Sequence, residues 1–288
     1  LYAEASENAA VAEGIRWHYH PVAMEATAAP AGKVSGDGAR VFTLVALADK
    51  LDTLTGYLGI GATPSGSSDP YGLRRAGQGV VRLLLDFWPT DREFSLEAVL
   101  QTAREGFGAA LTRPEDELRA ALRAFLLDRL RGVLTTRGAA ADEIDAVLSA
   151  RVEPLVHAAG TAARLRDLAA CRSEQPEVFA ALAEAFKRSK NIVGETSAGA
   201  VDPAAFVEDV ERRLNESLDA VAAVPAPDAA ARLQKIAAAQ PAVDAFFKGV
   251  MVNADDPKLK ANRLALLSRL LDLVYEVADL SKLASPSG

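Results

Sequence analysis

The chain has 288 residues, of which half are hydrophobic and a quarter charged, so it can bury substantial cores in about two domains. Its net charge of −7 argues against broad, non-specific affinity for nucleic acid, because such affinity comes from neutralising phosphates. A single cysteine, Cys171, excludes an internal disulfide, and no apolar run approaches the roughly 20 residues that span a bilayer. Together with the lack of a signal-peptide pattern, this predicts a cytoplasmic protein with no membrane segment.

Alanine, leucine and arginine dominate the composition, which favours helices. Residues 1–20 carry a helical pattern, residues 23–40 have the composition of an exposed loop, and residues 41–60 form the next apolar helix. The loop at 61–70 ends in Asp69-Pro70, which has the form of an N-cap carboxylate followed by a proline at the first helical position. A long helix is expected to continue from there through Asp86.

Another helix is predicted to begin at Arg113-Pro114, because acidic residues fill its first turn and apolar residues then recur every three or four positions. Asp202-Pro203 is expected to open a later helix, and residues 224–228 to separate it from the one after. We find no alternating strand pattern and no internal repeat, so the predicted fold class is all-α, built of multi-helix bundles. Further helical patterns lie at 142–150, 165–171 and 177–190.

The last helix is predicted to begin after a tight acidic turn, with Asp256 as the N-cap and Pro257 at the first position, where its missing N–H costs nothing. Lys258, Lys260 and Arg263 crowd the first two turns, although cations there oppose the helix dipole. That disadvantage indicates that these charges serve something other than the helix. A polar stripe is predicted on the side opposite the leucines: Arg269, Asp272, Glu276 and Asp279.

Motifs for nucleotide chemistry are missing from the sequence. Neither a G-x-x-x-x-G-K-[ST] loop nor a G-x-G-x-x-G segment after a strand occurs. The three histidines, His18, His20 and His157, are not at zinc-ligand spacing with cysteines. Cys171 has no histidine nearby in sequence to activate it and is expected to be a buried small hydrophobe. We therefore predict no catalytic residue, no metal site and no cofactor in this chain.

Two long phrases carry a resemblance to a known family. Residues 46–79 read ALADKLDTLTGYLGIGATPSGSSDPYGLRRAGQG, and residues 246–267 read FFKGVMVNADDPKLKANRLALL. Both resemble the β subunit of the bacterial tetrameric glycyl-tRNA synthetase, in which a second methionine usually stands at the position of Asn253. Weaker similarity at 186–192 and 277–283 extends the resemblance over essentially the whole chain, which we interpret as the C-terminal portion of such a subunit.

The resemblance implies three helical parts: an HD-like remnant over 1–63, a helical body over 64–173, and an anticodon-binding domain of the DALR type over 174–288. It further implies that the chain binds the anticodon region of tRNA(Gly) and positions the tRNA for glycylation by a separate α subunit in an α2β2 heterotetramer. The chain would then be part of glycine–tRNA ligase without being catalytic itself. The whole enzyme would use ATP and Mg²⁺ through the α subunit.

Candidate tRNA contacts are side chains that can hold phosphates or read the base edges of single-stranded loops. The run at 187–191 lies at a predicted helix C-terminus, where cations also favour the helix dipole, so a structural role is an equal alternative. Arg74 and Arg75 are explained more simply by an ordinary solvated helix face, with a phosphate or inter-domain contact as the functional alternative. The candidates are Lys187, Arg188, Lys190, Asn191, Lys258, Lys260, Asn262, Arg263, Arg74 and Arg75.

Two neighbouring features of the second phrase have competing interpretations. Arg263 could pair with Asp255 or Asp256 across the turn and only shape the loop. Phe246 and Phe247 are predicted to be core residues rather than stacking platforms, because their neighbours are apolar.

A different function is suggested by residues 48–52, Ala-Asp-Lys-Leu-Asp. This segment resembles the last element of HD-type metal-dependent phosphohydrolases, in which the aspartate matched by Asp49 binds the metal. Such a site also needs a His-Asp pair, and the chain contains none. We therefore expect Asp49 to be a vestigial position whose carboxylate has a hydrogen-bond partner. The alternatives are an HD-type phosphohydrolase fragment and a helical scaffold with no RNA role.

Overall fold

The computed structural model describes residues 9–21, 36–64, 69, 71–194, 199–225 and 228–284. Every regular element in these ranges is a helix, which confirms the predicted all-α class. None of these helices is both long enough and apolar enough to cross a membrane. The chain groups into two compact units: unit 1 is Leu1–Gly138 with Pro154–Ala162, and unit 2 is Ala139–Glu153 with Ala163–Gly288. The predicted division into three parts at 63 and 173 stays a prediction.

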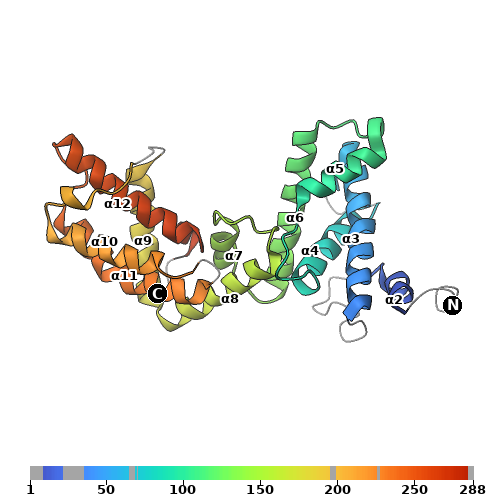
Figure 1. Ribbon diagram of the computed structural model, residues 1–288, viewed down its shortest axis with the longest axis horizontal. Coiled ribbons are helices and arrows are strands. Elements are labelled where there is room, and N and C mark those ends of the chain that lie inside the picture. The colour runs from blue at the N-terminus through green and yellow to red at the C-terminus, as the bar shows by residue number, and fades with distance from the viewer. Residues whose placement is uncertain are drawn as a thin grey trace. The chain divides into compact units, whose positions relative to one another are not determined.

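Unit 1 is built around the long helix α3 (Gly36–Gly59), which contacts four other helices (Figure 1). Its apolar side chains Phe42, Leu54 and Leu58 are completely or almost completely buried, which explains why neighbouring helices gather on it. The other elements of unit 1 are α2 (Ala9–Trp17), α4 (Leu73–Asp86), α5 (Leu96–Phe107), the short 3-10 helix η1 (Gly108–Ala110), α6 (Glu115–Thr136) and the first residues of α8 (Ala158–Glu174).

Helices α4 and α6 approach each other closely at a glycine. A Cβ atom at Gly77 would lie 2.6 Å from a ring carbon of Phe125, a distance that real Cβ atoms essentially never show. The absence of a side chain at Gly77 therefore lets the Phe125 ring pack directly on the α4 backbone. At the far end of the same helix pair, Arg137 donates to both carboxylate oxygens of Asp86 at 2.8 Å.

In unit 2, α12 (Pro257–Tyr275) packs against α9 (Pro176–Val193) and α10 (Asp209–Ala222), and α11 (Ala229–Gly249) covers both of those helices. The shared core is strongly apolar, with Phe186, Leu214 and Phe246 almost fully buried. The remaining elements are α7 (Ala141–Leu148), the rest of α8, and the 3-10 helices η2 (Pro203–Ala205) and η3 (Leu280–Lys282).

Helix starts that depend on local chemistry are confirmed in two cases. Asp256 caps α12 with Pro257 at its first position, and α6 opens with an acidic first turn directly after Pro114. The predicted start at Asp202-Pro203 is wrong for an α-helix, because Asp202 caps only the 3-10 turn η2. Helix α10 begins at Asp209 instead.

The first half of the chain differs from the sequence prediction at several boundaries. Helix α3 begins at Gly36, within the predicted loop, and α5 was not predicted at all. Helix α4 begins at Leu73, where the Asp69 carboxylate accepts from the backbone N–H of Leu73 at 2.7 Å and of Arg74 at 3.0 Å. Asp69 therefore caps this helix from outside it. Pro70, predicted at the first helical position, and residues 1–8 and 22–35 lie outside the described residues.

Three residues of the predicted polar stripe on α12 form ion pairs. Arg269 pairs with Asp219 at 2.6 Å. Asp272 pairs with Arg151 at 2.6 Å, and Glu276 pairs with Arg232. Asp279 does not belong to this stripe. It follows the helix, is only 3% exposed, and accepts from the backbone N–H of Ser281 at the start of η3.

Candidate functional site

The N-terminus of α12 carries exposed cations. The Asp256 carboxylate accepts from the backbone N–H of Lys258 at 2.8 Å, which fixes the direction of the first turn. Lys258 and Lys260 are both exposed, and neither ammonium group has an ion-pair partner within the described residues. Both charges are therefore available to an anion outside the fold. The helix dipole disfavours cations at this end, so the helix itself gains nothing from them.

Arg263, one turn further along α12, is buried rather than presented to solvent. Its Nε lies 2.7 Å from Oε1 of Glu211 in α10, and its Nη1 donates to the backbone oxygen of Met251 at 2.8 Å. The side chains of Arg263 and Glu211 are 7% and 0% exposed. The alternative in which Arg263 pairs with Asp255 or Asp256 is therefore wrong, because Arg263 lies on the face of α12 that packs against α10.

Glu211 is held as a carboxylate by several donors. Its Oε2 accepts from the backbone N–H of Val207 at 2.8 Å and of Glu208 at 2.7 Å, while Oε1 faces Arg263. Burial alone would raise the pKa of Glu211, but the hydrogen bonds from Arg263 and from these two backbone N–H groups lower it below its usual value. Sequence reasoning missed Glu211, whose only local signal is an acidic side chain in the first turn of a helix.

Asn262 fastens a second segment to α12. Its Nδ2 donates to the backbone oxygen of Asp202 at 3.0 Å, and its Oδ1 accepts from the Asp202 N–H at 2.8 Å. Asn262 and Arg263, here called the anchor pair, thus hold the segment before α10 and the turn before α12. Their polar groups are engaged inside unit 2, so a tRNA contact by these two residues stays a prediction, while Lys258 and Lys260 are open to solvent.

The basic run at the end of α9 is partly used by the fold. Lys187 pairs with Glu184 at 3.1 Å on the surface, an arrangement that contributes little to stability. Lys190 lies 3.2 Å from the buried carboxylate of Asp279. A hydrogen bond with Tyr275 raises the pKa of Lys190; burial opposes this, and Asp279 adds to the increase. Lys190 is therefore a structural contact between α9 and the chain after α12.

Arg188 and Asn191 are exposed, as is Lys190, but Lys190 is the one that pairs with Asp279. The Arg188 guanidinium lies 4.4 Å from the ring centroid of Phe247, close enough for a cation–π contact. Phe246 is fully buried, as predicted, whereas Phe247 is half-buried with Arg188 over its ring. The aromatic ring thus orients a surface guanidinium.

Arg74 and Arg75 lie in unit 1, on the first turn of α4, whereas the other eight candidate residues lie in unit 2. Arg74 is half-buried and Arg75 is exposed. The structure thus brings together the candidates of α9 and α12 within one unit, and leaves this arginine pair on a separate helix.

The carboxylate of Asp49 is exposed on α3 and has no hydrogen-bond partner in the described residues, so the expectation of such a partner is wrong. The next residue, Lys50, is buried and donates to the backbone oxygen of His18 at 2.9 Å. Within the described ranges, no three His, Cys, Asp or Glu side chains gather in a way that could hold a metal ion.

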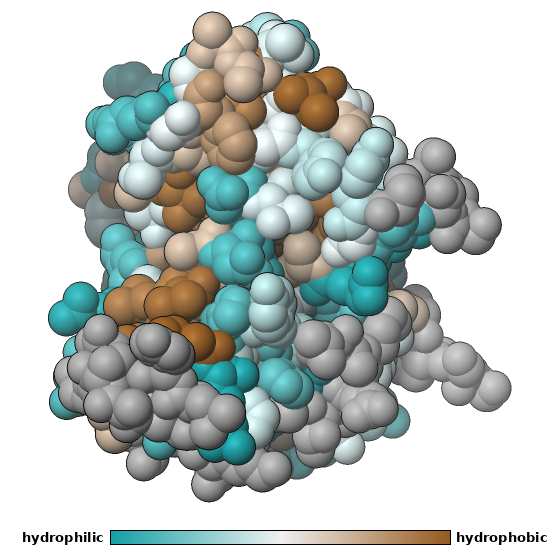
Figure 2. All heavy atoms as spheres, turned by 90° about the vertical axis from the view of Figure 1, so that its right-hand side faces the viewer, coloured by the Kyte–Doolittle hydropathy of each residue, from teal (hydrophilic) through white to brown (hydrophobic). Residues whose placement is uncertain are grey.

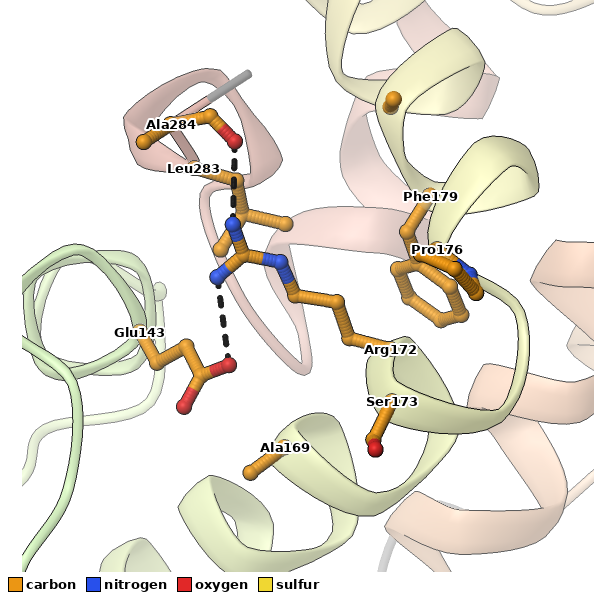
Figure 3. A pocket seen from close by; sticks show the side chains of 9 residues that line it. Glu143, Ala169, Arg172, Ser173, Pro176, Phe179, Leu283 and Ala284 are labelled. Carbon is orange, nitrogen blue, oxygen red and sulfur yellow. Dashed lines mark hydrogen bonds and ion pairs between the residues drawn. The ribbon is translucent and has the colours of Figure 1, made fainter. Parts of the chain in front are cut away.

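A small pocket in unit 2 surrounds Arg172, whose side chain reaches across it in Figure 3. The cavity has a volume of about 250 Å³. Arg172 lies 2.8 Å from Asp142 and 3.1 Å from Glu143, and it donates to the backbone oxygen of Ala284 at 2.9 Å. Burial would raise the pKa of Asp142, but the Ala284 N–H and Arg172 lower it. Since two carboxylates already neutralise this guanidinium, the pocket is better suited to holding Leu283 and Ala284 than to binding an anion.

These observations define an all-α protein of two helical units, with a net negative charge and with two exposed lysines at one helix N-terminus that have no ion-pair partner in the described part of the chain. Residues 1–149 match the family model described as the glycyl-tRNA synthetase beta subunit. The chain belongs to this family.

Curated relatives agree over most of the chain. It is 41% identical over 263 residues to the glycine–tRNA ligase beta subunit of Ralstonia nicotianae. The matched region is 86% of this chain and 35% of the relative. It is 42% identical over 256 residues to the protein of that name from Thiobacillus denitrificans, with coverage of 84% and 34%. For the Moorella thermoacetica protein of that name the identity is 38% over 293 residues, with coverage of 98% and 40%. The chain thus spans between about a third and two fifths of the length of these relatives.

Proposed function

We propose that this chain is the tRNA-recognition part of a glycine–tRNA ligase β subunit. It binds the anticodon region of tRNA(Gly) and positions the tRNA for glycylation by a separate α subunit in an α2β2 enzyme. The relatives that support this proposal are named as beta subunits of glycine–tRNA ligase.

One observation supports the RNA-binding role: Lys258 and Lys260 are exposed cations with no ion-pair partner among the described residues, at a helix end that disfavours cations. On a chain of net charge −7, such local charges are what a phosphate backbone would contact. The anchor pair fixes the turn that precedes them. The proposed contacts are Lys258 and Lys260 with Arg188 and Asn191 in unit 2, supported by Lys187, Lys190, Asn262 and Arg263, and Arg74 and Arg75 in unit 1.

In this proposal the bond-forming chemistry takes place on the α subunit and not on this chain. The sequence has no nucleotide-activating motif, so ATP and Mg²⁺ act on the α subunit of the complete enzyme. The chain then contributes by placing tRNA, and its variants should affect tRNA binding and not glycine activation.

The test is tRNA(Gly) binding by the complete enzyme carrying Lys258→Ala and Lys260→Ala, measured over a range of salt concentrations. If each lysine holds a phosphate, binding weakens and the salt dependence flattens by roughly one unit of slope per lysine. Glycine-dependent pyrophosphate exchange stays at the wild-type level. Lys248→Ala is the matched control, because Lys248 is an exposed lysine of unit 2 that already pairs with Asp244 at 2.6 Å. Unchanged affinity and an unchanged slope in the double variant would contradict the proposal.

A further inference from the structure

A groove between α3 and α5 in unit 1 has a volume of about 730 Å³. Its α5 wall is made by residues 98, 99, 102, 103, 106 and 107, which recur with helical spacing and form one face along most of that helix. Figure 2 shows brown and tan side chains lying among teal ones on the face that it presents.

The α5 wall of the groove combines three small residues with Val99, Thr102 and Phe107. Ala98, Ala103 and Gly106 lie on it, so a partner backbone can approach closely. A Cβ atom at Gly106 would meet nothing within 4 Å, which shows that the space above this glycine is empty. A groove that runs along a helix and has small residues on its α5 wall has the shape that accepts one face of another helix.

The α3 wall of the groove is acidic. Asp49 and Asp52 both line it, both are exposed, and neither carboxylate has a partner within the described residues. Lys50 interacts electrostatically with Asp49 but does not line the groove, since its side chain is buried and its Nζ donates to the backbone oxygen of His18. Two unpaired carboxylates repel phosphate, so this face is unsuited to RNA and complementary to cations.

We propose that this groove docks a helix of the partner subunit, one with a stripe of small apolar side chains flanked by Lys or Arg that reach Asp49 and Asp52. This inference deepens the proposed function, on which it rests for the existence of a partner subunit. It also gives the acidic segment at 48–52 a role that requires no metal. The α5 wall would bury most of the apolar surface of the docked helix, and the two carboxylates of α3 would set its orientation.

The steric test is Gly106→Leu in the full β subunit, with association to the α subunit measured by titration. The added side chain enters the empty groove, and replacing a helical glycine by leucine does not harm α5 itself. We expect association to weaken by roughly tenfold or more, the scale of truncating a well-packed interface contact. Gly132→Leu on α6 is the matched control, because a Cβ there also meets nothing within 4 Å and Gly132 does not line the groove. It should leave association unchanged.

The electrostatic test is Asp49→Lys with Asp52→Lys, which should weaken association to a similar extent, with the larger effect at low salt. Glu216→Lys in α10 is the control, since Glu216 is an exposed helical carboxylate that does not line the groove. Zero-length coupling of carboxylates to lysines in the wild-type complex, read by mass spectrometry, then identifies the occupant. A link from Asp49 or Asp52 to a lysine on a helix of the partner subunit supports the inference.

Other results overturn it in distinguishable ways. Normal association of both groove variants, or a link only to the same chain or to a second copy of it, overturns this inference and leaves the proposed function intact. If the wild-type subunits do not associate at all, the partnership in the proposed function fails, and this inference fails with it.

Discussion

Arg263 of α12 and Glu211 of α10 form a buried ion pair in unit 2, with Nε and Oε1 2.7 Å apart. Glu211 also accepts two backbone N–H groups, and Arg263 donates to the backbone oxygen of Met251. The pair therefore joins the segment before α10 to the turn before α12, and the exposed lysines of α12 follow directly after that turn.

Removing Arg263 should destabilise unit 2 strongly. Arg263→Ala leaves the Glu211 carboxylate buried without its cation, and breaking a buried pair in this way typically costs about 3–5 kcal/mol. Denaturant unfolding of the chain should show this loss, and the loss should be smaller when Glu211→Gln is already present, because a neutral amide needs no counter-charge. Lys260→Ala, on the exposed side of the same helix, should change stability by no more than about 0.5 kcal/mol. Equal effects of Arg263→Ala in both backgrounds would show that the two residues are not coupled.

The lowered pKa of Glu211 predicts the acid side of the stability profile. A carboxyl whose folded pKa is depressed contributes stability above its unfolded pKa, near 4.5, and loses it as the pH falls through the folded pKa. The difference in unfolding free energy between the wild type and Glu211→Gln should therefore shrink as the pH is lowered from about 6 to 3. Glu216→Gln, at an exposed position of the same helix, serves as the reference. A difference for Glu211→Gln that is independent of pH would mean that Arg263 does not hold this carboxyl in its charged form.

Glycine-to-alanine substitutions should have opposite effects at two helix positions. Gly77→Ala places a Cβ 2.6 Å from the Phe125 ring, so α4 and α6 must separate, at a cost of about 1–3 kcal/mol. Gly132→Ala meets nothing within 4 Å and should stabilise α6 by about 0.5–1 kcal/mol. Thermal unfolding of the two variants should move in opposite directions. A stable Gly77→Ala variant would show that the Phe125 ring can move aside at little cost.

Two aspartates of unit 1 should differ in the same assay. Asp69→Ala removes the acceptor for the Leu73 and Arg74 N–H groups and should cost about 0.5–2 kcal/mol, the range for lost helix caps. Asp49→Ala should stay within about 0.5 kcal/mol of the wild type, because its carboxylate is exposed and has no partner in the described residues. A divalent metal bound at one equivalent and lost in Asp49→Ala would instead favour the HD-type alternative.

Much of the fold could be predicted from sequence because its signals are local. The cap at Asp256, the proline behind it and the acidic first turn of α6 all act on backbone groups a few residues away, and all were found where predicted. The predicted start at Asp202-Pro203 failed because the same cap chemistry also begins a 3-10 turn, and packing decides whether a helix continues. Helix α5 was missed, although Ser95 caps it through the Ala98 N–H.

The candidate site shows where sequence reasoning ended. Residue type identified Lys258, Lys260, Asn262 and Arg263 as one group, but it could not tell which of them face solvent. That division depends on which face of α12 packs against α10, and the partner of Arg263 lies 52 residues away in sequence. Likewise, the resemblance presented Asp49 as a vestigial HD-type position, and only the packing of α3 against α5 placed it beside a groove.

The sequence by itself determined the helical class, several helix starts and the family, because composition, caps and long phrases are properties of neighbouring residues. The tertiary structure alone decided which charges are paired and which are exposed. The physical reason is that burial and ion pairing depend on long-range packing, which brings Glu211 to Arg263 and Asp202 to Asn262 and leaves Lys258 and Lys260 at the surface.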